Sequence, residues 1–99
     1  MNFKLSISPT AFSETNDAYI YYTNISEALG ERFLKSLEAT YDKLSRTPKY
    51  YSYINEFKDL RDTKLKDFPY VVIFQIIDNR VLVLRVFNTN RNPVSPKNL

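Results

Sequence analysis

Residues 70–87, YVVIFQIIDNRVLVLRVF, decide the fold that this sequence predicts. Residues 70–77 are almost all β-branched or aromatic, which is typical of a strand buried on most of both faces. Asp78 and Asn79 are common turn residues, so the chain is expected to return over residues 80–87 as the partner strand of a hairpin. Strict alternation along that partner predicts one face of Leu82, Leu84 and Val86 and another of Val81, Val83, Arg85 and Phe87.

Upstream of this hairpin, the sequence predicts one strand and two helices. Residues 3–7 alternate apolar and polar side chains, the pattern of a strand with one buried face. Ser8 followed by proline predicts a helix start, and the apolar spacing continues that helix to about Thr23. Ser26 is expected to cap a second helix, which ends at Pro48. The apolar stripe of the first helix contains Phe12, Thr15, Tyr19 and Tyr22, and that of the second contains Leu29, Phe33, Leu37, Tyr41 and Leu44.

The remaining segments complete a single α+β domain over residues 1–99. Residues 51–61 are expected to form a strand, residues 62–67 a charged turn, and residues 88–99 an extended tail. The predicted order is β-α-α-β-β-β. A helical hairpin then packs on one face of a mainly antiparallel four-stranded sheet, since its apolar faces need a surface to cover.

Composition excludes several classes of active site. The sequence has no cysteine and no histidine, which excludes disulfides, thiol catalysis, the commonest general base and the commonest zinc ligand. Gly30 is the only glycine and lies within a helical stripe, so a glycine-rich phosphate loop cannot form. No cofactor or metal is predicted. The start of the chain does not resemble a signal peptide and no apolar run is long enough to cross a bilayer, so a cytoplasmic location without membrane contact is expected.

The positive charge is concentrated in the second half of the chain. Residues 1–50 contain six basic and six acidic side chains, whereas residues 51–99 contain eight basic and five acidic ones. This asymmetry suggests contact with an anionic partner, although a soluble basic surface without a ligand would show it too. Arg85 lies among apolar neighbours. Its guanidinium would project into an open groove if its face points away from the helices, or it would extend into water at a sheet edge.

Taken in order along the chain, several motifs resemble the RelE/ParE superfamily of bacterial toxins over about residues 3–93. The motifs are the pair Tyr21-Tyr22, LGERFL at residues 29–34, LKDFPYVVIF at residues 65–74, and NTNRNP at residues 88–93. The resemblance implies one of two activities. RelE-like members cleave messenger RNA on the ribosome, and ParE-like members are associated with inhibition of DNA gyrase.

The resemblance also implies site residues. For target binding, it implies Lys64, Lys66, Arg85, Asn88 and Arg91. For RNA cleavage, it implies Arg61, Lys64, Lys66 and Arg85. RNA contains its own nucleophile, the 2′-OH, so a lysine base and arginines near the phosphate would suffice without metal or histidine.

Two departures favour the ParE-like branch. Asn88 stands where many relatives carry histidine, and an amide cannot shuttle protons. The tail also lacks the tyrosine that some RNA-cleaving members carry near their C-terminus. We therefore expect a toxin that inhibits DNA gyrase by protein contact, neutralised by a cognate antitoxin whose acidic, partly disordered segment orders over the basic sheet or adds to an exposed edge. The alternatives are a RelE-like endoribonuclease acting on the ribosome and its mRNA, and a basic binding module that has lost toxicity.

Overall fold

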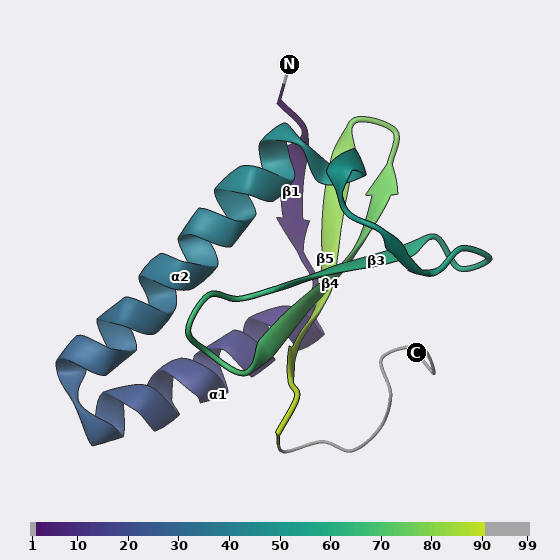
Figure 1. The fold of residues 1–99 in the computed structure, drawn as a ribbon. Coiled ribbons are helices and arrows are strands. Elements are labelled where there is room, and N and C mark those ends of the chain that lie inside the picture. Colours follow the sequence, from purple (N-terminus) through teal and green to yellow (C-terminus); the bar gives the residue numbers. More distant parts are fainter. Residues whose placement is uncertain (1, 91–99) are drawn as a thin grey trace.

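The computed structural model describes residues 2–90 and confirms the α+β class and the helical hairpin (Figure 1). The elements in chain order are β1 (Lys4–Ile7), α1 (Pro9–Ile25), α2 (Glu27–Arg46), the 3₁₀ helix η1 (Pro48–Tyr50), β2 (Tyr53–Asn55), β3 (Leu60–Lys64), β4 (Tyr70–Ile77) and β5 (Arg80–Asn88). The predicted tail lies outside the described residues beyond residue 90. None of the helices in residues 2–90 has the length and apolar character needed to span a membrane.

Both helices begin where the sequence predicts, because a serine side chain caps each of them. The Ser8 hydroxyl accepts a hydrogen bond from the Ala11 N–H at 3.0 Å. The Ser26 hydroxyl accepts one from the Leu29 N–H at 3.1 Å. Each bond satisfies one of the N–H groups that a helix start leaves without an intrahelical partner.

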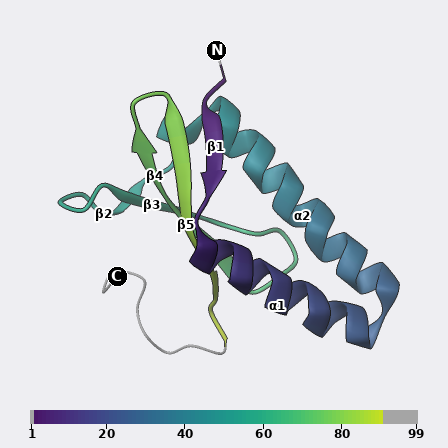
Figure 2. The ribbon, with the colours of Figure 1, turned by 180° about the vertical axis from the view of Figure 1, so that it is seen from behind.

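The sheet has five strands in the order β1-β5-β4-β3-β2. β1 pairs in parallel with β5, from Lys4 opposite Arg80 to Ile7 opposite Val83, and the other pairs are antiparallel. The two helices lie along one side of the sheet, and the β2–β3 hairpin projects from the edge opposite β1 (Figure 1). The reverse view shows α1 leaving directly from the end of β1, next to β5 (Figure 2).

An aromatic cluster fills the core between the helices and the sheet. The Tyr22 ring lies 5.4 Å from Phe33, 5.0 Å from Phe68 and 6.3 Å from Tyr70, measured between ring centroids. Phe68-Pro69-Tyr70 therefore has the packing role expected of an entry into a buried strand. The buried stripe of α1 is Ala11, Ala18 and Tyr22, whereas Phe12, which the spacing placed on that stripe, is 69% exposed.

β4 is buried on both faces, as predicted from its composition. Val72 and Phe74 face the helices, and Val71 and Ile73 belong to a second cluster on the other face. The second cluster also contains Leu60 and Phe87, with Ile54 and Leu84 packed against it.

The prediction of one strand over residues 51–61, followed by a turn, was wrong. These residues form the β2–β3 hairpin, and residues 62–64 belong to β3, so the sheet has five strands instead of four. Local polar contacts make the extra turn. The Asn55 Oδ1 accepts the Lys58 N–H at 3.1 Å, and Asp59 adopts a φ of 55°, a left-handed conformation that aspartate tolerates.

The predicted faces of the last strand were also wrong beyond Val83. Ile73 pairs with Arg85 and Phe74 pairs with Val83, so Leu84 is an extra residue in a bulge. One extra residue reverses the alternation that follows it. Val86 consequently packs in the helix-side core with Val81 and Val83, while Phe87 and Leu84 join the cluster on the other face.

Two candidate binding grooves

The first groove lies between α1 and β5 and has a volume of about 390 Å³. We call it the α1/β5 groove. Its lining residues are Glu14, Asp17, Ala18, Ile20, Tyr21, Tyr70, Arg85, Val86, Phe87 and Asn88. β1 pairs only with residues 80–83 of β5, and α1 packs beside the rest of that strand. The Ser8 hydroxyl donates to the Leu84 carbonyl at 2.8 Å and thereby fixes the start of α1 against β5.

Glu14 binds both the side chain of Arg85 and the backbone of β5. Its carboxylate accepts from Arg85 Nη2 at 2.7 Å and Nε at 3.0 Å, and from the Val86 N–H at 2.9 Å. Each side chain of this ion pair is 24% exposed. The hydrogen bonds that Arg85 donates to Glu14 raise the pKa of the Arg85 guanidinium, so Arg85 stays charged.

Arg85 therefore lies beside α1, where Glu14 holds its guanidinium, and is not free in the groove. The bulge and Glu14 direct its guanidinium toward α1, where it lines the α1/β5 groove and lies 5.3 Å from the Phe87 ring centroid. Asn88 lines the same groove. Its side-chain amide donates to the Tyr70 hydroxyl at 3.1 Å, and its carbonyl oxygen accepts the Asn90 N–H at 2.9 Å.

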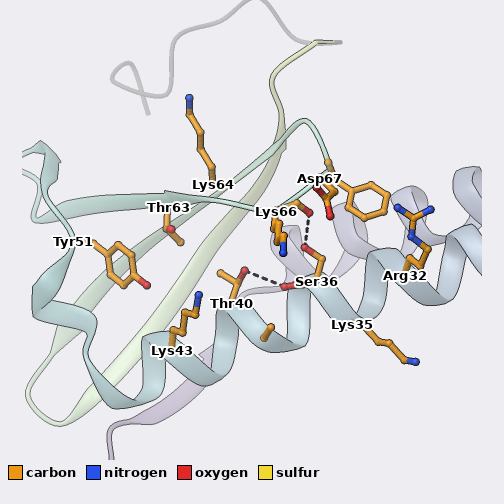
Figure 3. A pocket seen from close by; sticks show the side chains of 12 residues that line it. Arg32, Lys35, Ser36, Thr40, Lys43, Tyr51, Thr63, Lys64, Lys66 and Asp67 are labelled. Carbon is orange, nitrogen blue, oxygen red and sulfur yellow. Dashed lines mark hydrogen bonds between the residues drawn. The ribbon is translucent and has the colours of Figure 1, made fainter.

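The second groove lies between α2 on one side and β3 with the β3–β4 loop on the other, and has a volume of about 360 Å³. We call it the α2/β3 groove (Figure 3). Its lining residues are Arg32, Lys35, Ser36, Ala39, Thr40, Lys43, Tyr51, Thr63, Lys64, Lys66, Asp67 and Phe68. Five of these side chains are cationic and one is a carboxylate, so the groove is strongly basic.

The structure separates the sequence-predicted site residues into three places. Lys64 and Lys66 line the α2/β3 groove, whereas Arg85 and Asn88 line the α1/β5 groove. Arg61 lines neither. It donates to the Tyr51 carbonyl at 2.6 Å and stacks over the Tyr53 ring at 4.0 Å, which ties β3 to the segment before β2. Arg91 lies outside the described residues.

Sequence reasoning missed the contributions of the two helices. Glu14 was one of several scattered carboxylates with no local sign that it would meet β5. On α2, Arg32, Ser36 and Lys43 lie on one face at helical spacing, and this signal could have been found. No group of histidine, cysteine, aspartate or glutamate residues within residues 2–90 is arranged to hold a metal ion.

The sequence matches the family described as "ParE toxin of type II toxin-antitoxin system, parDE" over residues 5–93. This match includes both grooves and nearly the whole chain. The chain belongs to the ParE toxin family. No sequence among the curated proteins matches it significantly.

A solved structure described as the chromosomal ParDE toxin–antitoxin system from P. aeruginosa contains a chain similar to this ParE family member. The TM-score is 0.71 and the sequence identity is 17%, over 87% of this chain and 95% of the other. At this identity, the similarity supports the fold: a helical hairpin on a mostly antiparallel sheet.

Proposed function

We propose that this ParE family member inhibits DNA gyrase by direct protein contact and that a cognate antitoxin neutralises it. The observation that carries the proposal, beyond family membership, is the separation of the candidate catalytic residues. Arg61 is bound to a backbone carbonyl, Arg85 is bound to Glu14, and Lys66 lines the other groove. A ribonuclease needs its base and its cations within hydrogen-bond reach of one phosphate. This arrangement favours the inhibitor over the endoribonuclease.

The α1/β5 groove is the surface that we assign to protein contact. α1 exposes apolar side chains beside it, with Ile20 49% exposed and Tyr21 51% exposed. Phe12 and Ile25, at the two ends of the same helix, are 69% and 60% exposed. Exposed apolar side chains around a groove with fixed polar groups are typical of a protein interface. Arg85 and Asn88 supply the polar contacts, and Arg91 follows them in the chain.

Antitoxin binding is proposed on the same groove, because covering the target-binding surface is the simplest way to neutralise the toxin. The antitoxin segment would be partly disordered when free and would order in the groove. An acidic residue in that segment would contact the solvent-facing side of Arg85. Co-expression with the small gene product encoded next to this gene should restore growth, and a genome neighbourhood without a small partner gene would count against the proposal.

The deciding experiment expresses this chain alone in bacteria and compares the DNA damage response with messenger cleavage. Gyrase inhibition predicts an SOS response while messenger RNA stays intact. Cleaved ribosome-bound messages would contradict the proposal and support the endoribonuclease. Normal growth with soluble expression would support a non-toxic binding module.

A pair of variants tests whether the α1/β5 groove is the contact surface. Ile20→Asp places a charge on the exposed rim of that groove and should abolish growth arrest. The matched control is Phe57→Asp, because Phe57 is fully exposed at the tip of the β2–β3 hairpin and lines neither groove. Equal toxicity of the two variants, at equal soluble levels, would show that the groove is not the contact surface.

A further inference from the structure

Within residues 2–90, no cation of the α2/β3 groove belongs to an ion pair, although Lys64 lies close enough to Asp62 to oppose the rise that burial causes in the pKa of that carboxyl. Ion pairs among residues 2–90 form between Arg46 and Asp42 and between Arg85 and Glu14. Neither pair involves a side chain of the groove. Five cations and one carboxylate, Asp67, line the groove, so its net charge is positive and an anion that enters it would relieve the repulsion among the cations.

Two of these cations point into the groove from opposite walls. Lys43 extends from α2 toward the centre, and Lys66 extends toward it from the β3–β4 loop (Figure 3). Lys35 and Lys64 point away from the centre in the same view. Lys43 and Lys66 therefore form the inner pair, and Lys35 and Lys64 form an outer pair.

The walls of the groove are held in position by hydrogen bonds. The Ser36 hydroxyl donates to the Lys66 carbonyl at 2.8 Å, which fixes the loop against α2. The buried Thr40 hydroxyl donates to the Ser36 carbonyl at 3.0 Å. The bond within α2 orients Ser36, and the bond from Ser36 to the loop sets the spacing of the two walls, so the inner pair does not depend on loop closure to face one anion.

Tyr51 closes one end of the groove and provides a rigid aromatic ring. Its ring centroid lies 6.0 Å from that of Phe74 and 5.3 Å from that of Tyr50, both edge to face. Its hydroxyl points into the groove, near Lys43 and Thr63 (Figure 3). An aromatic side chain beside basic residues is the combination that proteins use to hold a base and its phosphates.

We propose that the α2/β3 groove binds a phosphate-bearing small molecule of nucleotide size, with the phosphates between Lys43 and Lys66 and the ring toward Tyr51. Lysine ammonium groups bind phosphate as point charges. The volume of about 360 Å³ lies in the range of small-molecule sites. Such a ligand would bind in the α2/β3 groove, whereas the surface proposed for gyrase contact is the α1/β5 groove.

The test follows backbone amide NMR signals of the full chain during titration with ATP, and separately with adenosine and with pyrophosphate. Saturable shifts with ATP are expected along the groove wall of α2 and over residues 63–67. Adenosine should bind about tenfold more weakly, because the contacts to phosphate carry most of the affinity. Shifts confined to other surfaces, or none at millimolar ATP, would overturn the proposal.

Three double variants with the same loss of charge locate the site. Lys43→Gln with Lys66→Gln should weaken ATP binding by about tenfold or more. Lys35→Gln with Lys64→Gln should weaken it by about twofold, since these side chains contribute only at long range. Lys4→Gln with Lys58→Gln lies outside the groove and should have no effect. Equal weakening by all three would show attraction to net charge alone and would overturn the proposal, as would tighter binding of an oligonucleotide than of ATP.

Discussion

The two grooves have similar volumes and differ in what their charged residues do. In the α1/β5 groove, Arg85 and Glu14 are bound to each other and to the backbone of β5, so their charges hold the fold together. In the α2/β3 groove, Lys43 and Lys66 point into the groove from α2 and from the β3–β4 loop (Figure 3), and neither forms an ion pair within residues 2–90. The fold thus supplies the counter-charge of Arg85 but not that of Lys43 or Lys66. Arg85 can contact a partner only through its solvent-facing side, whereas the two lysines keep their whole ammonium groups available to an anion.

The largest expected effect comes from removing the carboxylate of the α1/β5 groove. Glu14→Ala leaves the guanidinium of Arg85 and the Val86 N–H without their partner, both partly shielded from water. We expect the free energy of unfolding, measured by urea denaturation, to fall by about 2–3 kcal/mol. Asp42→Ala is the matched control because it removes an exposed ion pair with Arg46, and it should cost less than about 0.5 kcal/mol. Equal losses would mean that the Glu14 contacts are not structural.

A second effect concerns α2, the helix that forms one wall of the basic groove. Burial raises the pKa of Tyr41 to about 12, against an ordinary value of 10.0, with the nearby Thr15 side chain opposing the shift. Above pH 10 the unfolded chain releases this proton while the folded chain retains it. Stability should therefore fall between pH 10 and pH 12, by up to about 2 kcal/mol after allowance for partial exposure.

Tyr41→Phe isolates this contribution, because the variant lacks the Tyr41 hydroxyl and is otherwise identical to the parent chain. The difference in unfolding free energy between the variant and the parent chain should shift in favour of the variant as the pH rises from 10 to 12. A pH-independent difference would contradict the assigned pKa.

A third effect, of about 1 kcal/mol, concerns the contact between α1 and α2, the helices that each line one of the two grooves. A methyl group at Gly30 would lie 2.1 Å from the Thr23 hydroxyl and 3.2 Å from the Thr23 Cα. Gly30→Ala should destabilise the fold by about 1 kcal/mol, since the clash outweighs the gain in helix propensity. Adding Thr23→Ala should recover most of the loss, as thermal unfolding would show. The same cost in both backgrounds would place its origin elsewhere.

The smallest expected effect distinguishes the α2/β3 groove from the α1/β5 groove most sharply. Lys43→Gln with Lys66→Gln removes two like charges that face each other, so stability should stay constant or rise by no more than about 0.5 kcal/mol at low salt. The difference should vanish at about 1 M salt, where the screening length is about 3 Å. A loss comparable to that of Glu14→Ala would mean that these lysines support the fold.

Local sequence signals predicted much of the fold. The composition of residues 70–77 and the turn at Asp78 and Asn79 indicated the β4–β5 hairpin, and Ser8 and Ser26 indicated both helix starts. These features depend on neighbours a few positions apart. The β2–β3 turn was missed because its charged residues resemble a loop, and its strands are defined by pairing with β4 rather than by apolar alternation.

The candidate site was harder to predict because it depends on contacts between distant residues. Glu14 and Arg85 are separated by 71 positions, and the bulge at Leu84 changes the direction of Arg85. Lys64 and Lys66 were identified as basic residues of the loop. Lys43 joins them only because Ser36 anchors that loop to α2, a contact across 30 positions.

The most direct test of the proposed function adds the purified chain to DNA gyrase and relaxed circular DNA and measures supercoiling. Inhibition of supercoiling by the parent chain and the Phe57→Asp control, and its loss in Ile20→Asp, is the result that contact through the α1/β5 groove predicts. Full supercoiling at saturating concentrations of the parent chain, together with cleavage of ribosome-bound messenger RNA by the same preparation, would contradict it.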